Sequence, residues 1–354
     1  MKMWYESQKS GNHILVAARV RLARNLVDYP FSMKITKEQS RALTDEVREK
    51  FFRQCCQEDN FYRYYDLEST DSRMKNAMAE RYTMTPLLRD KKLPAGLIVS
   101  EDESRCIMIG EEDHLRIQAA SMGDTMDAAY QTACQLDDEM GGHVEYAYNH
   151  KYGYITACPT SMGTGLRAAY IMHLPFLEKE NLIKPLADEL NRLGFIMRNM
   201  YGDASGALGS LYQLSNQRTL GMSEEDILIS LKNMMVQVTD QERRSRERLL
   251  RKRRPEIEDI IYRSYGVLKY GKMFGAGEAL NHLSNIRMGF DEGILHGSDS
   301  AGDIFAIMMN VLPGTLMCSK GKNFGSADRH LCRAGYIHTS LPDIDDAYSH
   351  QAPD

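Results

Sequence analysis

The sequence changes character near Gly221, and this change constrains the fold more than any other feature. Before it, short apolar and β-branched segments alternate with segments of helical periodicity; after it, almost everything up to about Gly297 is helical in character. Alternating elements followed by a run of helices predict a chain with two parts. A length of 354 residues fits about two domains. We place the boundary at 235/236, inside a composition shift that spans residues 222–254.

Local periodicity predicts the individual elements. Strands are expected at 14–22, 97–100, 106–109, 144–148, 152–158, 195–201 and 210–215. Helices are expected at 37–54 after the candidate N-cap Thr36, at 125–140, at 177–193 and from Ser223 onward. Pro255 should end or kink the helix that follows Ser223. The apolar segment 303–312 should form a further helix, closed by Pro313.

Composition excludes several classes of protein. A net charge of −5, with 26% charged and 43% hydrophobic residues, is typical of an ordinary globular chain and not of a disordered or nucleic-acid-binding one. No segment approaches the roughly 18 apolar residues of a membrane span. The N-terminus lacks the apolar core of a signal peptide. We therefore expect a cytoplasmic protein with no membrane segment and no direct nucleic-acid role.

The segment 243–254 is a local exception, because it holds eight basic residues. It is either a solvated stretch of a long helix or a docking patch for an acidic partner or nucleic acid. The sequence leaves both interpretations open.

The first candidate site lies on the strand that contains Arg19 and Arg21. Side chains alternate along a strand, so both arginines point to one face. Neighbouring guanidinium groups repel each other unless an anion lies between them, and Arg binds phosphate oxygens through paired hydrogen bonds. The pair is therefore either a polyphosphate site or an ordinary exposed strand face.

The second candidate is the acidic segment after the predicted strand 106–109. Three consecutive carboxylates, Glu111, Glu112 and Asp113, precede His114 and Arg116. Such a cluster could position a metal, hold a cationic substrate or act as a base. The alternative is an acidic loop at the start of a helix.

Two further segments contain glycines next to charged residues. Cys158–Arg167 follows a predicted strand, and its small residues permit a tight turn and close approach of the backbone to a ligand. It lacks the Gly-Lys-Ser/Thr of a P-loop. Cys158 is either a site thiol or a small buried apolar residue. The loop that carries Arg198 and Asp203 has no particular meaning on its own.

Together, these segments resemble the phosphagen (guanidino) kinase superfamily, which includes arginine kinase and creatine kinase. The resemblance runs in order from about Val16 to Glu225. It rests on EEDHLR at 111–116, CPTSMGTGLR at 158–167 and SNQRTLGMSE at 215–224. It implies an α+β fold, with a guanidino-kinase-like catalytic domain at 1–235 in which helices flank an antiparallel sheet. A mainly α-helical C-terminal domain would follow at 236–354.

The order of the segments indicates which group within the superfamily the chain resembles. Metabolic members of the superfamily carry a helical domain before the arginine-rich strand, whereas here that strand begins near residue 14 and the helical residues follow the catalytic segment. This layout resembles that of bacterial protein-arginine kinases. It implies phosphorylation of arginine side chains in proteins, with ATP and Mg²⁺, in stress response and protein quality control. It also implies a homodimer, and as partners a zinc-binding activator protein, a heat-shock transcriptional repressor and a Clp-type unfoldase.

The resemblance also implies roles for single residues. The arginines that grip the nucleotide phosphates match Arg19, Arg21, Arg116, Arg167 and Arg198. The residues that hold the substrate guanidinium match Glu112, Cys158 and the loop carboxylate Asp203, and Glu112 would also take the proton. Glu111 matches the residue that reaches Mg²⁺ through water. Arg329 and Arg333 match a phosphoarginine-binding regulatory motif, although they could instead form ordinary surface salt bridges.

The chain departs from the family pattern at several positions, namely Ala17 and Ala18 for two serines, Gly110 for Asn, Asn199 for Gly, Asp203 for Glu and His330 for Asp. Ala17 and Ala18 would remove hydroxyl donors near the phosphates. Two alternatives stay open beside an active protein-arginine kinase, and the departures motivate the first of them. One is a catalytically weakened adaptor of the same fold, and the other is a kinase for a small free guanidine.

Overall fold

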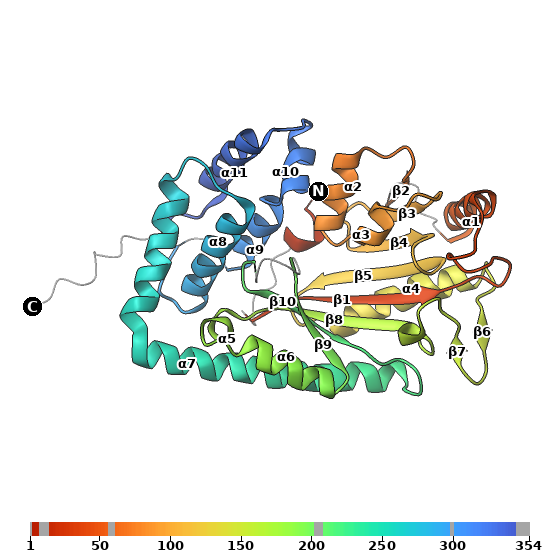
Figure 1. Cartoon of the computed structure of the whole chain (residues 1–354), viewed down its shortest axis with the longest axis horizontal. Coiled ribbons are helices and arrows are strands. Elements are labelled where there is room, and N and C mark those ends of the chain that lie inside the picture. The colour runs from red at the N-terminus through yellow and green to blue at the C-terminus, as the bar shows by residue number, and fades with distance from the viewer. Residues whose placement is uncertain (1, 7–13, 56–60, 202–207, 298–300, 345–354) are drawn as a thin grey trace, which may run out of the picture.

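The computed structural model describes residues 2–6, 14–55, 61–201, 208–297 and 301–344. At its centre is an eight-stranded antiparallel sheet with the order β2-β3-β4-β5-β1-β8-β10-β9 (Figure 1). Its strands are β1 (Leu15–Arg24), β2 (Tyr62–Asp66), β3 (Gly96–Ser100), β4 (Arg105–Ile109), β5 (Leu115–Met122), β8 (Leu166–His173), β9 (Phe195–Asn199) and β10 (Leu211–Asn216). A small separate hairpin pairs β6 (Tyr148–Asn149) with β7 (Gly153–Tyr154).

Helices surround the sheet and form the C-terminal part. The first group comprises η1 (Trp4–Glu6), α1 (Lys37–Lys50), η2 (Phe51–Cys55), α2 (Ser72–Glu80), α3 (Pro86–Arg89), α4 (Met126–Gly141), η3 (Pro159–Ser161), α5 (Pro175–Lys179) and α6 (Ile183–Arg192). The second group comprises α7 (Glu224–Tyr270), α8 (Ala276–Asp291), α9 (Ala301–Asn310), α10 (Pro313–Lys320) and α11 (Ser326–Ser340).

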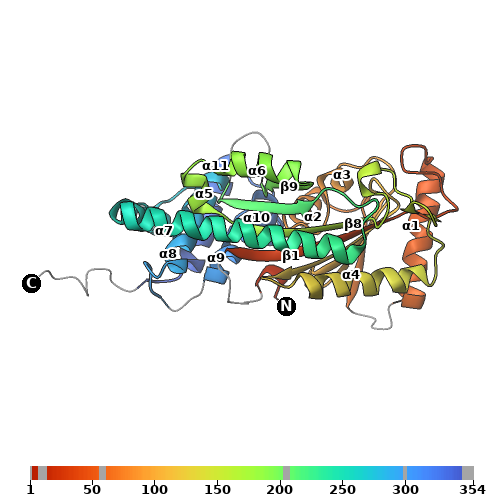
Figure 2. The same cartoon turned by 90° about the horizontal axis from the view of Figure 1, so that it is seen from below.

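The two faces of the sheet differ in chemistry because side chains alternate along each strand. On β1, Val20 and Leu22 belong to a hydrophobic core that includes residues of α1, α4 and the first half of α7. Figure 2 shows α4 and α7 crossing the same face of the sheet. Arg19 and Arg21 have the opposite parity and point to the other face. Helices therefore bury this face, whereas the other face is apolar on β3 and β4, where α2 and α3 pack, and carries polar side chains around Arg19 and Arg21.

The C-terminal helices share a second core with one end of the sheet. Apolar residues of α8, α9, α11 and the second half of α7 pack there with Trp4 from the N-terminus and with Ala17 and Ile171 from two central strands. A polar contact adds to this packing, because the Glu80 carboxylate at the end of α2 accepts hydrogen bonds from Gly314 N and Thr315 N at 2.7 Å each. A carboxylate at a helix N-terminus is favourable, so α2 anchors α10.

Most predicted elements are confirmed, and some are wrong in extent. The expected helix 177–193 is two helices, α5 and α6, because Asn181 adopts a left-handed φ of +59° that interrupts the helical run. The hairpin expected at 144–158 is confined to the short strands β6 and β7. Pro313 does not close α9; it is the first residue of α10. Strands β2, β5 and β8 were not expected.

Helix α7 crosses the proposed boundary at 235/236, which stays a prediction. Ser223 is its N-cap and accepts a hydrogen bond from Asp226 N, as expected. The backbone at Arg253 is non-helical, with φ −143° and ψ 36°, so Pro255 produces a kink. The basic run 243–254 occupies the stretch up to this kink. Arg246 pairs with Glu292 at 2.7 Å, whereas Arg251 and Lys252 are exposed.

A candidate nucleotide and guanidine site

Arginines from four strands converge on the polar face of the sheet. Arg21 of β1 lies directly opposite Arg167 of β8, Arg116 lies on the neighbouring β5, and Arg198 lies on β9. These four line a pocket of about 370 Å³. Glu112 and Cys158 line the same pocket. The structure thus brings six of the sequence-predicted site residues together.

The electrostatics of this cluster favour an anion. Burial lowers the pKa of Arg21 well below its ordinary value, and Arg19, Arg116 and Arg167 lower that pKa further. Burial also lowers the pKa of Arg167. Among the described residues, the buried Nε of Arg21 has no hydrogen-bond acceptor. Guanidinium groups stay protonated in proteins, so the cluster is a site for a polyanion such as a nucleotide polyphosphate.

Arg19 lies beside this pocket rather than in its lining. Its side chain is 6% exposed, and its Nη2 donates to Gln213 Oε1 at 2.5 Å. Its guanidinium carbon lies 4.7 Å from the centroid of the Tyr82 ring. Gln213 lines the pocket. Arg19 therefore contacts the pocket lining through Gln213, and its direct contact with phosphate stays a prediction.

The two consecutive glutamates have different environments. Glu111 is buried, and its Oε1 accepts hydrogen bonds from Arg116 Nη1 and Thr85 Oγ1, both at 2.6 Å. The Glu112 side chain is 42% exposed, and its Oε2 lies 3.5 Å from Arg116 Nη2. Arg116 therefore bridges the two carboxylates. Glu112 stays accessible to a cationic substrate in the pocket.

Within the described part of the chain, no cluster of three or more His, Cys, Asp or Glu side chains could hold a metal ion by itself. The carboxylates nearest to the arginines are Glu111 and Glu112. This donor set suits Mg²⁺, which commonly binds through one or two carboxylates together with substrate phosphates. The role of Glu111 toward Mg²⁺ stays a prediction.

Asp113 and His114 hold the site together and do not line it. Asp113 Oδ1 accepts hydrogen bonds from Asn25 Nδ2 and from Ala157 N, both at 2.7 Å. His114 Nδ1 accepts a hydrogen bond from Leu26 N at 3.0 Å. Its Nε2 therefore carries the proton and donates to Pro30 O at 3.0 Å. Burial lowers the pKa of His114, which keeps the ring neutral. Asp113 thus ties β1 to the residue before Cys158.

Cys158 begins the glycine-rich loop, with its half-buried Sγ 3.0 Å from Thr160 Oγ1. Gly163 and Gly165 have φ values of +106° and +69°. A Cβ added at Gly165 would lie 2.6 Å from Ala23 O, so only glycine permits this approach of the loop to β1. The loop therefore lies against the strand that carries the first two arginines.

Arg24 is a structural residue that sequence reasoning missed. It is buried, pairs with Asp137 of α4 at 2.6 Å, and donates from Nη1 to Thr164 O at 3.0 Å. It thereby fixes the glycine-rich loop to α4. Its position in the strand could have indicated this role, because a residue of opposite parity from Arg19 and Arg21 points to the other face of the sheet.

The loop carboxylate and the positions that depart from the family pattern were also predicted to matter. Asp203 lies outside the described residues. Ala17 and Ala18 are fully buried in the two hydrophobic cores and do not line the pocket, and the expected loss of hydroxyl donors near the phosphates stays a prediction. Gly110 adopts φ +76°, a left-handed conformation that Asn also tolerates better than most residues.

The candidate regulatory arginines lie on α11 and differ from each other. Arg333 is 1% exposed and donates from Nε to Val311 O at 2.8 Å and from Nη1 to Phe274 O at 2.7 Å. Arg329 is half-buried. In the described part of the chain, neither has a carboxylate within ion-pair distance. Phosphoarginine binding by this pair stays a prediction.

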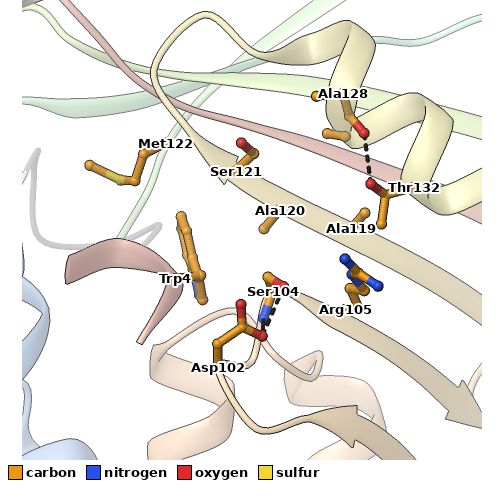
Figure 3. A pocket seen from close by; sticks show the side chains of 11 residues that line it. Trp4, Asp102, Ser104, Arg105, Ala119, Ala120, Ser121, Met122, Ala128 and Thr132 are labelled. Carbon is orange, nitrogen blue, oxygen red and sulfur yellow. Dashed lines mark hydrogen bonds between the residues drawn. The ribbon is translucent and has the colours of Figure 1, made fainter. Parts of the chain in front are cut away.

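A second cavity of about 220 Å³ lies beside Trp4, between β5 and the start of α4 (Figure 3). Its lining consists mainly of small side chains, with Asp102 and Arg105 as the charged members. None of the sequence-predicted site residues lines it. The pocket at Arg21 and Glu112 is therefore the candidate site.

The fold and this pocket define a guanidino-group phosphotransferase. Residues 42–245 match the C-terminal catalytic domain of the ATP:guanido phosphotransferases. Among solved structures, the duplicated taurocyamine kinase of Schistosoma mansoni is similar with a TM-score of 0.57 and 23% identity, over 67% of this chain and 35% of that one. Lombricine kinase gives a TM-score of 0.57 with 21% identity, over 66% of this chain and 68% of that one. These structures support the fold.

More similar sequences identify the family within this class. Residues 254–352 match the C-terminal domain of the protein-arginine kinase McsB. Protein-arginine kinases from Clostridium kluyveri and Halalkalibacterium halodurans are both 37% identical to this chain. The alignments cover 96% of this chain and 99% and 94% of those proteins. The chain belongs to the protein-arginine kinase family. Within the described residues, no helix combines the length and apolarity needed to cross a membrane.

Proposed function

We propose that this protein transfers the γ-phosphoryl group of ATP to arginine side chains of other proteins. The observation that carries the proposal is one shared pocket, in which Arg21, Arg116 and Arg167 lie with Glu112 and Cys158. A site for a polyphosphate and a site for a guanidinium group are thus adjacent. Phosphoryl transfer to a nitrogen of arginine needs this combination.

The arginines would hold the phosphates and spread the charge of the transferred group. We assign this role to Arg21, Arg116, Arg167 and Arg198, with Arg19 beside them. When bound, Mg²⁺ would neutralise phosphate charge, and Glu111 would hold it through water. Arg116 contacts both glutamates, so it would align the phosphates with the carboxylates.

Glu112 would orient the substrate guanidinium and accept its proton. An arginine side chain has a pKa above about 12, so its terminal nitrogen is a poor nucleophile until a proton leaves. A carboxylate in hydrogen-bond reach can remove that proton in the transition state. Cys158 would contact the other side of the planar group. We include Asp203 as a further candidate for guanidinium binding.

Membership of the family also supports proposals about finer properties. We propose a cytoplasmic homodimer that acts in stress response and protein quality control. Its partners would include a zinc-binding activator protein, a heat-shock transcriptional repressor and a Clp-type unfoldase. Arg329 and Arg333 would bind phosphoarginine. The match of residues 254–352 to the C-terminal domain of a protein-arginine kinase supports this part of the proposal.

The direct test is to incubate the full-length protein with ATP, Mg²⁺ and an arginine-rich protein, and to map acid-labile phosphate by mass spectrometry. We expect phosphate on arginine and none on a lysine-rich, arginine-free polypeptide of similar charge. Free arginine, tested in parallel, distinguishes a kinase for small guanidines. Phosphate transfer to free arginine but not to protein would contradict the proposed substrate.

A further inference from the structure

Tyr82 is a backbone outlier next to the candidate site. Its φ is +64°, in the left-handed region that an aromatic residue rarely adopts. Such a conformation persists only where surrounding contacts enforce it, and it is often associated with function. On its own the outlier shows strain, so its contacts decide what the residue does.

Three contacts of Tyr82 reach three different strands or strand ends of the site. Its ring lies 4.7 Å from the Arg19 guanidinium carbon. Its hydroxyl donates to Met200 O, just beyond the β9 strand that carries Arg198. Its own carbonyl accepts from Gln118 Nε2 at 2.7 Å, and Gln118 lies two residues after Arg116 on β5.

These contacts belong to a ring of interactions that links Tyr82 to Arg19 and Arg198. Arg19 donates to Gln213, which is the register partner of Arg198 in the β9–β10 ladder. The chain then runs from Arg198 to Met200 and returns to Tyr82 through the phenol. Burial raises the pKa of Tyr82, so the phenol stays protonated and remains a donor.

We propose that Tyr82 is a positioning residue of the nucleotide site, which fixes Arg19 through its ring and Arg198 through its hydroxyl. This inference rests on the proposed function, because it assigns these arginines to the phosphates. A ring beneath a desolvated guanidinium restricts it by cation–π attraction. A hydrogen bond at Met200 fixes the direction in which β9 ends, and with it the placement of Arg198.

The two halves of this role can be separated by substitution. Tyr82→Phe keeps the ring and removes the hydroxyl, whereas Tyr82→Leu removes both. We expect Tyr82→Phe to leave the Kd for ADP within about twofold of the wild-type value and to lower kcat about fivefold, because only the Met200 contact is lost. We expect Tyr82→Leu to weaken ADP binding about fivefold relative to Tyr82→Phe, because the contact with Arg19 is lost as well.

The matched control is Tyr5→Phe. Tyr5 is also a buried tyrosine whose hydroxyl bonds to another segment, donating to Asn310 Oδ1 at 2.9 Å, but it contacts none of the site arginines. It should leave both constants unchanged. Calorimetric titration of the full-length proteins with ADP, together with steady-state kinetics, measures the difference.

Each outcome decides one question. Equal ADP affinity of the Phe and Leu variants would overturn the role of the ring, and a wild-type kcat in Tyr82→Phe would overturn the role of the hydroxyl. Failure of the wild-type protein to bind ADP would refute the proposed function itself. If Tyr82→Leu does not fold, the comparison of Tyr82→Phe with Tyr5→Phe still tests the split between kcat and binding.

Discussion

Arg21 of β1 lies directly opposite Arg167 of β8 in the antiparallel ladder at the centre of the sheet. Like charges at directly opposite positions destabilise a sheet. Here the cost is raised by burial, and the Nε of Arg21 has no acceptor among the described residues. The protein therefore holds an arrangement that is unfavourable when empty and favourable when an anion lies between the two guanidinium groups.

Replacement of Arg21 should consequently stabilise the nucleotide-free protein while removing its activity. We expect Arg21→Met to raise the free energy of unfolding by about 1 kcal/mol, because an apolar side chain of similar length replaces a desolvated charge that is repelled by Arg19, Arg116 and Arg167. The kcat/KM for ATP should fall about a hundredfold or more, as for loss of a charged donor to a transition state. Urea denaturation with and without ADP, and steady-state kinetics, measure both effects.

Arg251→Met is the control for this prediction, because Arg251 is exposed on α7. It should change neither the stability nor the kinetics appreciably. A less stable Arg21→Met protein that ADP still stabilises as strongly as the wild type would show that Arg21 is a structural residue.

Glu112→Gln should separate chemistry from nucleotide binding. The carboxylate is exposed to the pocket and is the partner assigned to the guanidinium, whereas the phosphate contacts are assigned to the arginines. We expect the rate of phosphoryl transfer to fall more than tenfold, a loss above about 1.4 kcal/mol, with the Kd for ADP nearly unchanged. Glu247→Gln, at an exposed position of α7, is the matched control. A variant that keeps more than about a tenth of the rate would exclude Glu112 as the main base.

Short-range pattern was sufficient for part of this site. Alternation along one strand placed Arg19 and Arg21 on a common face. The signal fails where neighbouring residues of one type serve different purposes. Glu112 and Asp113 are adjacent acids, yet one opens to the pocket and the other is buried against Asn25 and Ala157. The residues that they contact are far away in sequence, so no local property of the segment shows which of the two acids lines the pocket.

Long-range pairing accounts for the remaining misses. The opposition of Arg21 and Arg167 depends on the β1–β8 register, which is set across more than a hundred residues and has no trace in either segment alone. Tyr82 has the same limitation, since its contacts with Arg19 and Met200 exist only after the sheet has formed. The division into two parts, by contrast, followed from the order of helical and strand periodicity, which is local, and the fold class followed from the resemblance of short motifs to a known family.

Glu242 gives the stability of the protein a distinct dependence on pH. It is buried on α7, its two oxygens accept from Phe176 N and Leu177 N at 3.0 and 2.9 Å, and burial raises its pKa from 4.5 to about 7. The folded state therefore binds a proton more tightly than the unfolded state. The contribution of Glu242 to stability is fully present below pH 4.5 and is lost as the pH rises through about 7.

Comparison with Glu242→Gln isolates this contribution. The variant should lack the decline between pH 4.5 and 7, so the difference in unfolding free energy between the two proteins should change with pH across that window. His114, whose pKa burial lowers, contributes with the opposite sign in both proteins and cancels in the comparison. Urea denaturation at several pH values measures the difference. A difference that does not vary with pH would show that Glu242 titrates alike in the folded and unfolded states.

The two arginines of α11 should respond differently to substitution, and this difference makes phosphoarginine binding testable. Arg333 holds the carbonyls of Val311 and Phe274, so Arg333→Ala should destabilise the protein by about 1–3 kcal/mol through unsatisfied buried acceptors, whatever it binds. Arg329 is half-buried and forms no such buried hydrogen bonds among the described residues, so Arg329→Ala should leave the melting temperature nearly unchanged.

If this face of α11 binds phosphoarginine, Arg329→Ala alone should weaken binding of free phosphoarginine about tenfold, through loss of a charge-assisted contact. Calorimetric titration at constant salt measures this, and unmodified arginine serves as the negative ligand. Wild-type affinity in a folded Arg329→Ala protein would show that the stretch with His330 does not use Arg329 for sensing.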